Sequence, residues 1–113
     1  MNTSLATQQI SGEPLYHIVF VSTATAPLSV KQVRKLISAS TQRNRALGIT
    51  GLLLYANERF MGCLEGPELA VKDTFASIRS DHRHKNIDTL RCENTEDRLF
   101  SHWQMSVRNF AVD

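Results

Sequence analysis

The sequence has no hydrophobic run long enough to cross a bilayer, which needs about 18 or more consecutive apolar residues. Its first residues, MNTSLATQQISGEP, lack both the basic start and the unbroken apolar stretch of a signal peptide. These two absences argue against a membrane-spanning protein and against a secreted one. The sequence therefore predicts a cytoplasmic protein without a membrane partner.

Cysteine is scarce, and basic charge is not concentrated in one place. Cys63 and Cys92 have no C-x-x-C spacing and no secretory context, so we expect two buried thiols. His82 and His84 are close in sequence but lack a further pair of ligands, so no metal site is predicted. A net charge of +2 falls short of the clustered basic face that nucleic-acid binding usually needs.

The 113 residues have the length of a single domain, and 42% of them are hydrophobic, enough for a packed core. Residues 1–13 are polar and without periodicity, which predicts a flexible lead-in to a domain over 14–113. Within that domain the apolar pattern and the turn residues predict two helices, one starting at Ser29 with a capping box to Gln32 and one opened by Gly66 and Pro67. They also predict five strands and a connection at 94–103 with one short helix; the strands are expected at 15–22, 48–56, 59–65, 87–93 and 104–110.

This order of elements predicts an α+β fold. The expected architecture is a ferredoxin-like βαββαβ sheet with two helices on one face, plus a short fifth strand. No further element is left to cover the opposite face of the sheet. An uncovered apolar face predicts association with a second copy of the chain or with another protein.

Two common functions of ferredoxin-like sheets find little support in the residues. An RNA-recognition module needs several aromatic side chains on a central strand, whereas RFMGCLEG (59–66) offers one aromatic followed by an acid. A small hydrolase needs a nucleophile and a base near an anion cradle, and no such grouping is visible. The sequence therefore predicts a protein that is not an enzyme.

Several motifs on the predicted strands closely resemble the BLUF family of flavin-dependent blue-light sensors. They are QRNRALGITGLLLY, RFMGCLEGPE, DHRH and WQMS, and the resemblance extends over roughly residues 14–110. It implies a flavin, FAD or FMN, held between the two helices over the sheet. It also implies a light-driven step in which a first-strand tyrosine gives an electron and a proton, while a third-strand glutamine rearranges its hydrogen bonds to the flavin.

The sequence departs from the family at both photochemical positions. Phe20 stands where the family has the tyrosine, and Gly62 stands where it has the glutamine. Tyr16 shares a strand face with Phe20 but lies about 13 Å away along the strand, too far to reach the same ring edge. Gln104 is the one nearby amide of interest, and its direction is not determined by the sequence.

Other positions match the flavin-binding pattern of the family. The resemblance implies that Asn44 hydrogen-bonds the pyrimidine edge of the flavin, with Arg43 beside it, and that Arg83 approaches a ring carbonyl, followed by His84. Apolar contacts with the ring are expected from Phe60, Leu64, Leu36 and Ile78. Trp103 and Met105 match the pair of residues that reports the light signal in the family. In many members an arginine that holds the cofactor phosphates stands where this chain has Ser77.

Each of these residues also has a purely structural explanation. Asn44 can close the first helix, Arg83 and His84 can complement a helix end, and the apolar residues are ordinary core positions in such a fold. The leading prediction is a sensory or regulatory domain of the BLUF type that binds flavin without the usual photocycle and acts through protein–protein contacts. The alternatives are a photoreceptor that uses non-standard residues and a cofactor-free oligomerisation module. The sequence does not name a downstream partner.

Overall fold

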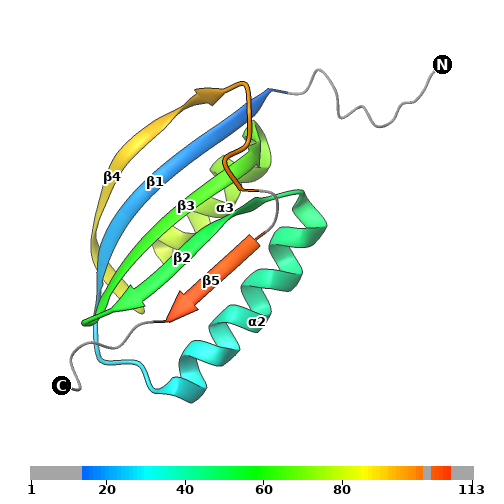
Figure 1. The fold of residues 1–113 in the computed structure, drawn as a ribbon. Coiled ribbons are helices and arrows are strands. Elements are labelled where there is room, and N and C mark those ends of the chain that lie inside the picture. The colour runs from blue at the N-terminus through cyan, green and yellow to red at the C-terminus, as the bar shows by residue number, and fades with distance from the viewer. Residues whose placement is uncertain (1–13, 101–102, 108–113) are drawn as a thin grey trace.

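The computed structural model describes residues 14–100 and, for the backbone alone, residues 103–107. The lead-in predicted for residues 1–13 lies outside the described residues. One sheet contains five strands in the order β4-β1-β3-β2-β5, and β5 runs parallel to β2 while the other neighbours are antiparallel (Figure 1). Their bounds are Leu15–Ala24 for β1, Thr50–Ala56 for β2, Arg59–Pro67 for β3, His84–Thr95 for β4 and Trp103–Val107 for β5.

Two helices, α2 (Val30–Leu47) and α3 (Glu68–Ser80), pack on one face of this sheet. The core under α3 contains Val71 and Phe75, which contact inward residues of β1 and β3. The core under α2 contains Val33, which packs near Tyr55 and Phe60. The α+β, ferredoxin-like arrangement predicted from the order of elements is thereby confirmed, and so is the fifth strand.

Local signals in the sequence explain where α2 and the central hairpin begin and end. Ser29 caps α2 in a complete capping box with Gln32, and Gly48 ends the helix with a left-handed φ of 73°. Asn57 and Glu58 both have positive φ, at 53° and 61°, which is the signature of the type I′ turn that joins antiparallel strands. This turn joins the two strands that the sequence predicts at 48–56 and 59–65.

Several predicted boundaries were wrong. Strand β4 begins at His84 rather than 87, because the residues after α3 pair directly with the end of β1. Strand β3 continues through Gly66 and Pro67, so these residues do not open a helix; α3 begins at Glu68 and Pro67 precedes it as N-cap. The short helix expected in the 94–103 connection is not found in its described part, residues 94–100.

The predicted burial was also wrong for one of the two cysteines. Cys63 is buried as predicted, but Cys92 is exposed. The reason is that Cys92 lies on β4, which forms an edge of the sheet and pairs only with β1. None of the helices in the described part of the chain is long and apolar enough to span a membrane.

Alternation along β3 divides its side chains between two different environments. Phe60, Gly62 and Leu64 face the helices, whereas Met61, Cys63 and Glu65 face the opposite side of the sheet. This alternation matters for function because one face of β3 forms the floor of a pocket and the other carries a buried polar cluster.

Phe20 and Gly62 form a direct cross-strand pair between β1 and β3. A Cβ atom added to Gly62 would lie 2.5 Å from both Cε1 and Cζ of the Phe20 ring, so the ring covers the glycine. An aromatic ring that packs over a glycine on the neighbouring strand compensates for the weak strand propensity of glycine. Phe20 is 2% exposed and packs against Phe75, with ring centroids 5.4 Å apart.

We expect Gly62→Ala to lower the free energy of unfolding by about 1–2 kcal/mol, because the new methyl group overlaps the Phe20 ring. An alanine in an ordinary strand position would instead stabilise the strand by about 0.5–1 kcal/mol relative to glycine. Urea denaturation of Gly62→Ala, Phe20→Leu and the double variant measures the coupling. The double variant should recover most of the loss; a Gly62→Ala protein as stable as the wild type would show that the ring does not constrain this position.

Candidate functional site

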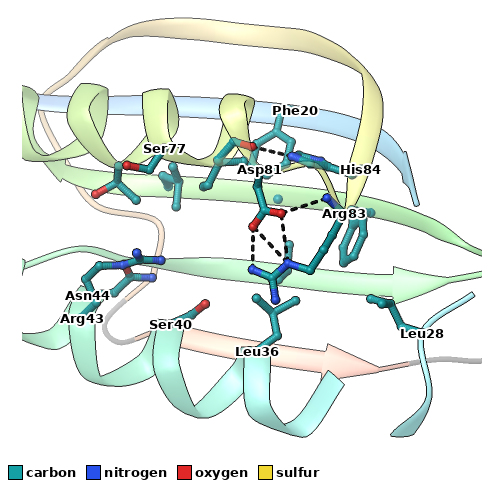
Figure 2. A pocket seen from close by; sticks show the side chains of 16 residues that line it. Phe20, Leu28, Leu36, Ser40, Arg43, Asn44, Ser77, Asp81, Arg83 and His84 are labelled. Carbon is teal, nitrogen blue, oxygen red and sulfur yellow. Dashed lines mark hydrogen bonds and ion pairs between the residues drawn. The ribbon is translucent and has the colours of Figure 1, made fainter. Parts of the chain in front are cut away.

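A pocket lies between α2 and α3, over the inward face of β1, β2 and β3 (Figure 2). Its cavity volume is about 140 Å³. Ten of the eleven site residues predicted from the sequence line it: Phe20, Leu36, Arg43, Asn44, Phe60, Gly62, Leu64, Ile78, Arg83 and His84.

The eleventh predicted residue, Met105, lies on β5, and its backbone is paired with that of Leu53 on β2. The side chain of Met105 is outside the described residues, and so is that of Trp103. Leu53 itself lines the pocket, so the backbone of Met105 runs beside the pocket wall.

Sequence reasoning missed five other residues of the lining: Leu28, Ser40, Leu53, Thr74 and Asp81. It had noted Ser77, which also lines the pocket, only as a replaced arginine. Two of the missed residues could have been predicted from their spacing in the sequence. Ser40 is four residues after Leu36 on the same helical stripe, and Leu53 shares its strand face with Tyr55. The other positions depend on how α3 and the loop before α2 pack on the sheet, which no local pattern encodes.

The amide of Asn44 is the most informative group in the pocket wall. Asn44 is 2% exposed, and its Oδ1 has no hydrogen-bond partner among the described residues. Its side chain does not close α2, because Gly48 provides the C-cap and the Asn44 backbone carbonyl accepts from the Ile49 N–H at 2.9 Å. A buried acceptor without a partner costs about 1–3 kcal/mol, so this amide is suited to a ligand that donates a hydrogen bond.

Thr74 provides a second polar atom of the same kind. It lies on α3, is 5% exposed, and its Oγ1 also has no partner among the described residues. Asn44 and Thr74 come from the two helices that flank the pocket. The pocket therefore combines mostly apolar walls with unsatisfied polar groups from both sides, which is the usual composition of a binding site.

Arg83 is held by Asp81 at the other end of the pocket (Figure 2). Its Nη2 donates to Asp81 Oδ2 at 2.5 Å, and its Nε donates to both carboxylate oxygens at 3.0 and 3.1 Å. These hydrogen bonds lower the pKa of Asp81 to about 2, so the carboxylate is ionised at neutral pH. A ligand that uses the Arg83 guanidinium must share it with this carboxylate.

His84 ties the end of α3 to the sheet. Its Nε2 lies 2.5 Å from the carbonyl oxygen of Ile78, which can only accept, so Nε2 carries the proton. Its Nδ1 lies 2.7 Å from Ser22 Oγ on β1. The ring also meets Phe60 edge-on, with centroids 6.0 Å apart. Both ring nitrogens are thus engaged by the protein, and His84 positions the pocket wall.

Both tyrosines of the chain are engaged away from the pocket lining. Tyr16 shares the strand face of Phe20, but its hydroxyl lies 2.8 Å from Cys92 Sγ, and this contact raises the pKa of Tyr16. The hydroxyl of Tyr55 accepts from the Leu28 backbone N–H at 3.1 Å. Gln104 has its backbone beside Leu52, and its side chain is outside the described residues. Among the described lining residues there is no phenol, and Asn44 carries the one carboxamide.

Comparison with known proteins gives a consistent picture. Residues 15–106 match the family model BLUF, described as sensors of blue-light using FAD. The chain is 33% identical over 90 residues to the photoactivated adenylate cyclase subunit beta of Euglena longa, covering 79% of this chain and 10% of that protein. The chain therefore spans about a tenth of the length of this relative.

Two solved structures have the same fold. The dark-state structure of BlrB, a BLUF protein, superposes with a TM-score of 0.78 at 32% identity, covering 86% of this chain and 74% of that one. BlrP1 of Klebsiella pneumoniae with FMN and cyclic diGMP gives a TM-score of 0.76 at 28% identity, covering 87% of this chain and 26% of that one. Together with the match over residues 15–106, these comparisons show that the chain belongs to the BLUF family.

Proposed function

We propose that this protein is a regulatory BLUF domain that binds a flavin but does not carry out the usual light-driven hydrogen-bond rearrangement. The observation that carries the proposal is the pairing of two features in one pocket. Asn44 presents a buried amide oxygen that has no hydrogen-bond partner in the described part of the chain, while the Phe20 ring covers Gly62 at the position of the switching glutamine. The first feature favours ligand binding, and the second removes the response.

The residues of the pocket fit a flavin ring as a ligand. The apolar side chains of Leu36, Ile78 and Leu64 come from both helices and the sheet, and they suit a flat aromatic ring between them. The Asn44 amide can accept from the imide N–H of the ring and donate to a neighbouring carbonyl. A bound flavin supplies absorption of blue light and the capacity to accept an electron.

Arg43 is placed to compensate for the missing phosphate-directed arginine. Figure 2 shows Arg43 on α2 at the same end of the pocket as Ser77 on α3, the position where many members carry that arginine. A guanidinium at this end can form charge-assisted hydrogen bonds to a phosphate. Both FAD and FMN carry a phosphate on the ribityl chain, so the proposal covers either cofactor.

The light response needs groups that these positions do not have. The Phe20 ring has no hydroxyl to lose a proton, and Gly62 has no side chain to exchange a donor for an acceptor. Among the described residues of the pocket, no other phenol or glutamine takes their place. We therefore expect excitation of a bound flavin to return to the starting state without a lasting change in its hydrogen bonds.

Two other functions remain as alternatives. A photoreceptor with non-standard residues would need another relay, and Gln104 or Trp103 would be its candidate sources. A cofactor-free interaction module is favoured by the Phe20 ring, which already fills the space that a glutamine would occupy. We propose a sensory role for this domain, since its residues 15–106 match the family described as sensors of blue-light using FAD.

The absorption spectrum separates these possibilities. The protein reconstituted with FAD or FMN should be yellow and show no red shift of the flavin band after blue light. Phe20→Tyr/Gly62→Gln should gain a reversible red shift, provided that the tyrosine ring moves off residue 62, whereas each single change should not. A shift in the wild type would establish a photoreceptor, and a flavin-loaded double variant without a shift would show that other parts of the relay are also missing.

Asn44→Ala tests flavin binding, because it should lower the affinity for flavin and leave the stability of the flavin-free protein unchanged. We expect about fivefold weaker flavin binding, since one buried hydrogen bond is worth about 1 kcal/mol. Without flavin, the same change should not destabilise the protein, because Oδ1 has no hydrogen-bond partner among residues 14–100 to lose. Titration by flavin fluorescence and thermal unfolding measure the two effects, with the exposed Gln42→Ala on the same helix as control. Equal affinity in both variants would contradict the assignment of Asn44.

We further propose that the chain self-associates through the face of the sheet that α2 and α3 do not cover. Val19, Val21, Leu52 and Leu54 are half-buried on this face, and Met61 is 45% exposed. An apolar surface of this kind favours a second copy or a downstream protein.

Sedimentation tests this surface. The wild type should form a dimer or larger species, and Met61→Glu should shift it toward monomer because a charge is then desolvated at the contact. Leu69→Glu, a matched change at an exposed leucine on α3, should have no such effect. A wild-type monomer at micromolar concentration would contradict the proposal.

A further inference from the structure

Three side chains with metal-binding atoms meet on the face of the sheet opposite the pocket. His17 on β1 and Glu65 on β3 are direct partners in the antiparallel ladder. Cys63 precedes Glu65 by two residues on β3 and therefore points to the same face. The sequence distance between His17 and the other two hid this cluster, because only the pairing of β1 with β3 brings them together.

The three ligand atoms converge on a small volume. His17 Nδ1 lies 3.2 Å from Glu65 Oε2 and 3.9 Å from Cys63 Sγ, and all three atoms lie within 4.8 Å of one another. The residues are almost completely buried, with exposures of 5% for His17, 8% for Cys63 and 0% for Glu65. Buried polar groups at this spacing can surround a single ion.

The geometry does not suit a cysteine nucleophile. A Cys–His–acid relay uses both ring nitrogens, one for the thiol and one for the carboxylate. Here the thiol and the carboxylate both face Nδ1. Burial and the nearby Glu65 carboxylate also raise the pKa of the metal-free Cys63 thiol to about 11, so this thiol is weakly nucleophilic at neutral pH, and a bound metal ion would displace its proton to solvent.

We infer that His17 Nδ1, Cys63 Sγ and a Glu65 carboxylate oxygen form a binding site for a divalent transition-metal ion of the Zn²⁺ class. A nitrogen, a sulfur and an oxygen ligand match the borderline preference of Zn²⁺ and its analogue Co²⁺. Ca²⁺ and Mg²⁺ prefer oxygen ligands, and this cluster offers only one such side chain. Three protein ligands leave a fourth position for water or another group.

The surroundings of Glu65 would hold such a site in place. Its carboxylate accepts hydrogen bonds from the backbone N–H groups of Leu99 and Phe100, at 2.8 to 3.0 Å. Contacts of this kind orient a ligating carboxylate and strengthen the site. The Arg98 guanidinium contacts the backbone oxygen of Glu65, and among the described residues His17 is the one ion-pair partner of the carboxylate. A bound cation would therefore meet a buried carboxylate that forms no ion pair with a lysine or arginine of the described residues.

Co²⁺ is a suitable probe because a cobalt–thiolate bond produces a charge-transfer band in the near ultraviolet. We expect the reduced wild-type protein to bind one equivalent of Co²⁺ with this band, and Zn²⁺ to displace it. Cys63→Ser should lose the band, and His17→Gln should bind at least about tenfold more weakly. Cys92→Ser removes the exposed cysteine on β4 and should retain both the band and the affinity.

Two outcomes would overturn the site. One is a wild-type titration that gives no saturable charge-transfer band. The other is a band that persists in Cys63→Ser or disappears in Cys92→Ser. Circular dichroism of each variant without metal verifies folding; if Cys63→Ser does not fold, Cys63→Ala and His17→Gln provide the same comparison. None of these readouts depends on flavin, so the result is independent of the proposed function.

Discussion

The contact between the Phe20 ring and Gly62 is the constraint on which the rest of the pocket depends. The two residues face each other across β1 and β3, and the ring occupies the space that any side chain at position 62 would need. Phe20 and Gly62 therefore depend on each other. The ring compensates for the weak strand propensity of the glycine, and the glycine leaves room for the ring. In the proposed function, the same pairing takes the positions at which the family resemblance implies a redox-active hydroxyl and a switching amide.

The alternation of β3 gives the two sides of the sheet different chemistry. Gly62 and Leu64 belong to the pocket between the helices, while Cys63 and Glu65 belong to the buried cluster with His17 on the opposite side. The carboxylate of Glu65 also accepts hydrogen bonds from backbone N–H groups of the β4–β5 connection, which leads to β5 beside β2. One strand thus contributes to the candidate pocket, to the polar cluster and to the contacts with the connection that leads to the last strand.

Most of the fold and most of the pocket could be predicted from the sequence, because their signals are local. The capping box at Ser29 and the turn at Asn57 mark element boundaries within a few residues, and motif matches identified ten lining residues. The start of β4 at His84 and the exposure of Cys92 could not be predicted, since they depend on which strand forms the sheet edge. The convergence of His17 with Cys63 and Glu65 could not be predicted either, nor could the lack of a hydrogen-bond partner for the Asn44 oxygen among the described residues. These features arise from strand register and helix packing, which relate residues far apart in the chain.

A crystal structure of the flavin-loaded protein tests the central claim most directly. The account predicts that the Phe20 ring still covers Gly62, that Asn44 contacts the flavin, and that no carboxamide lies between Phe20 and the ring system. A structure in which Phe20 has turned away and the side chain of Gln104 reaches the flavin would contradict it, because the relay would then be present in another form.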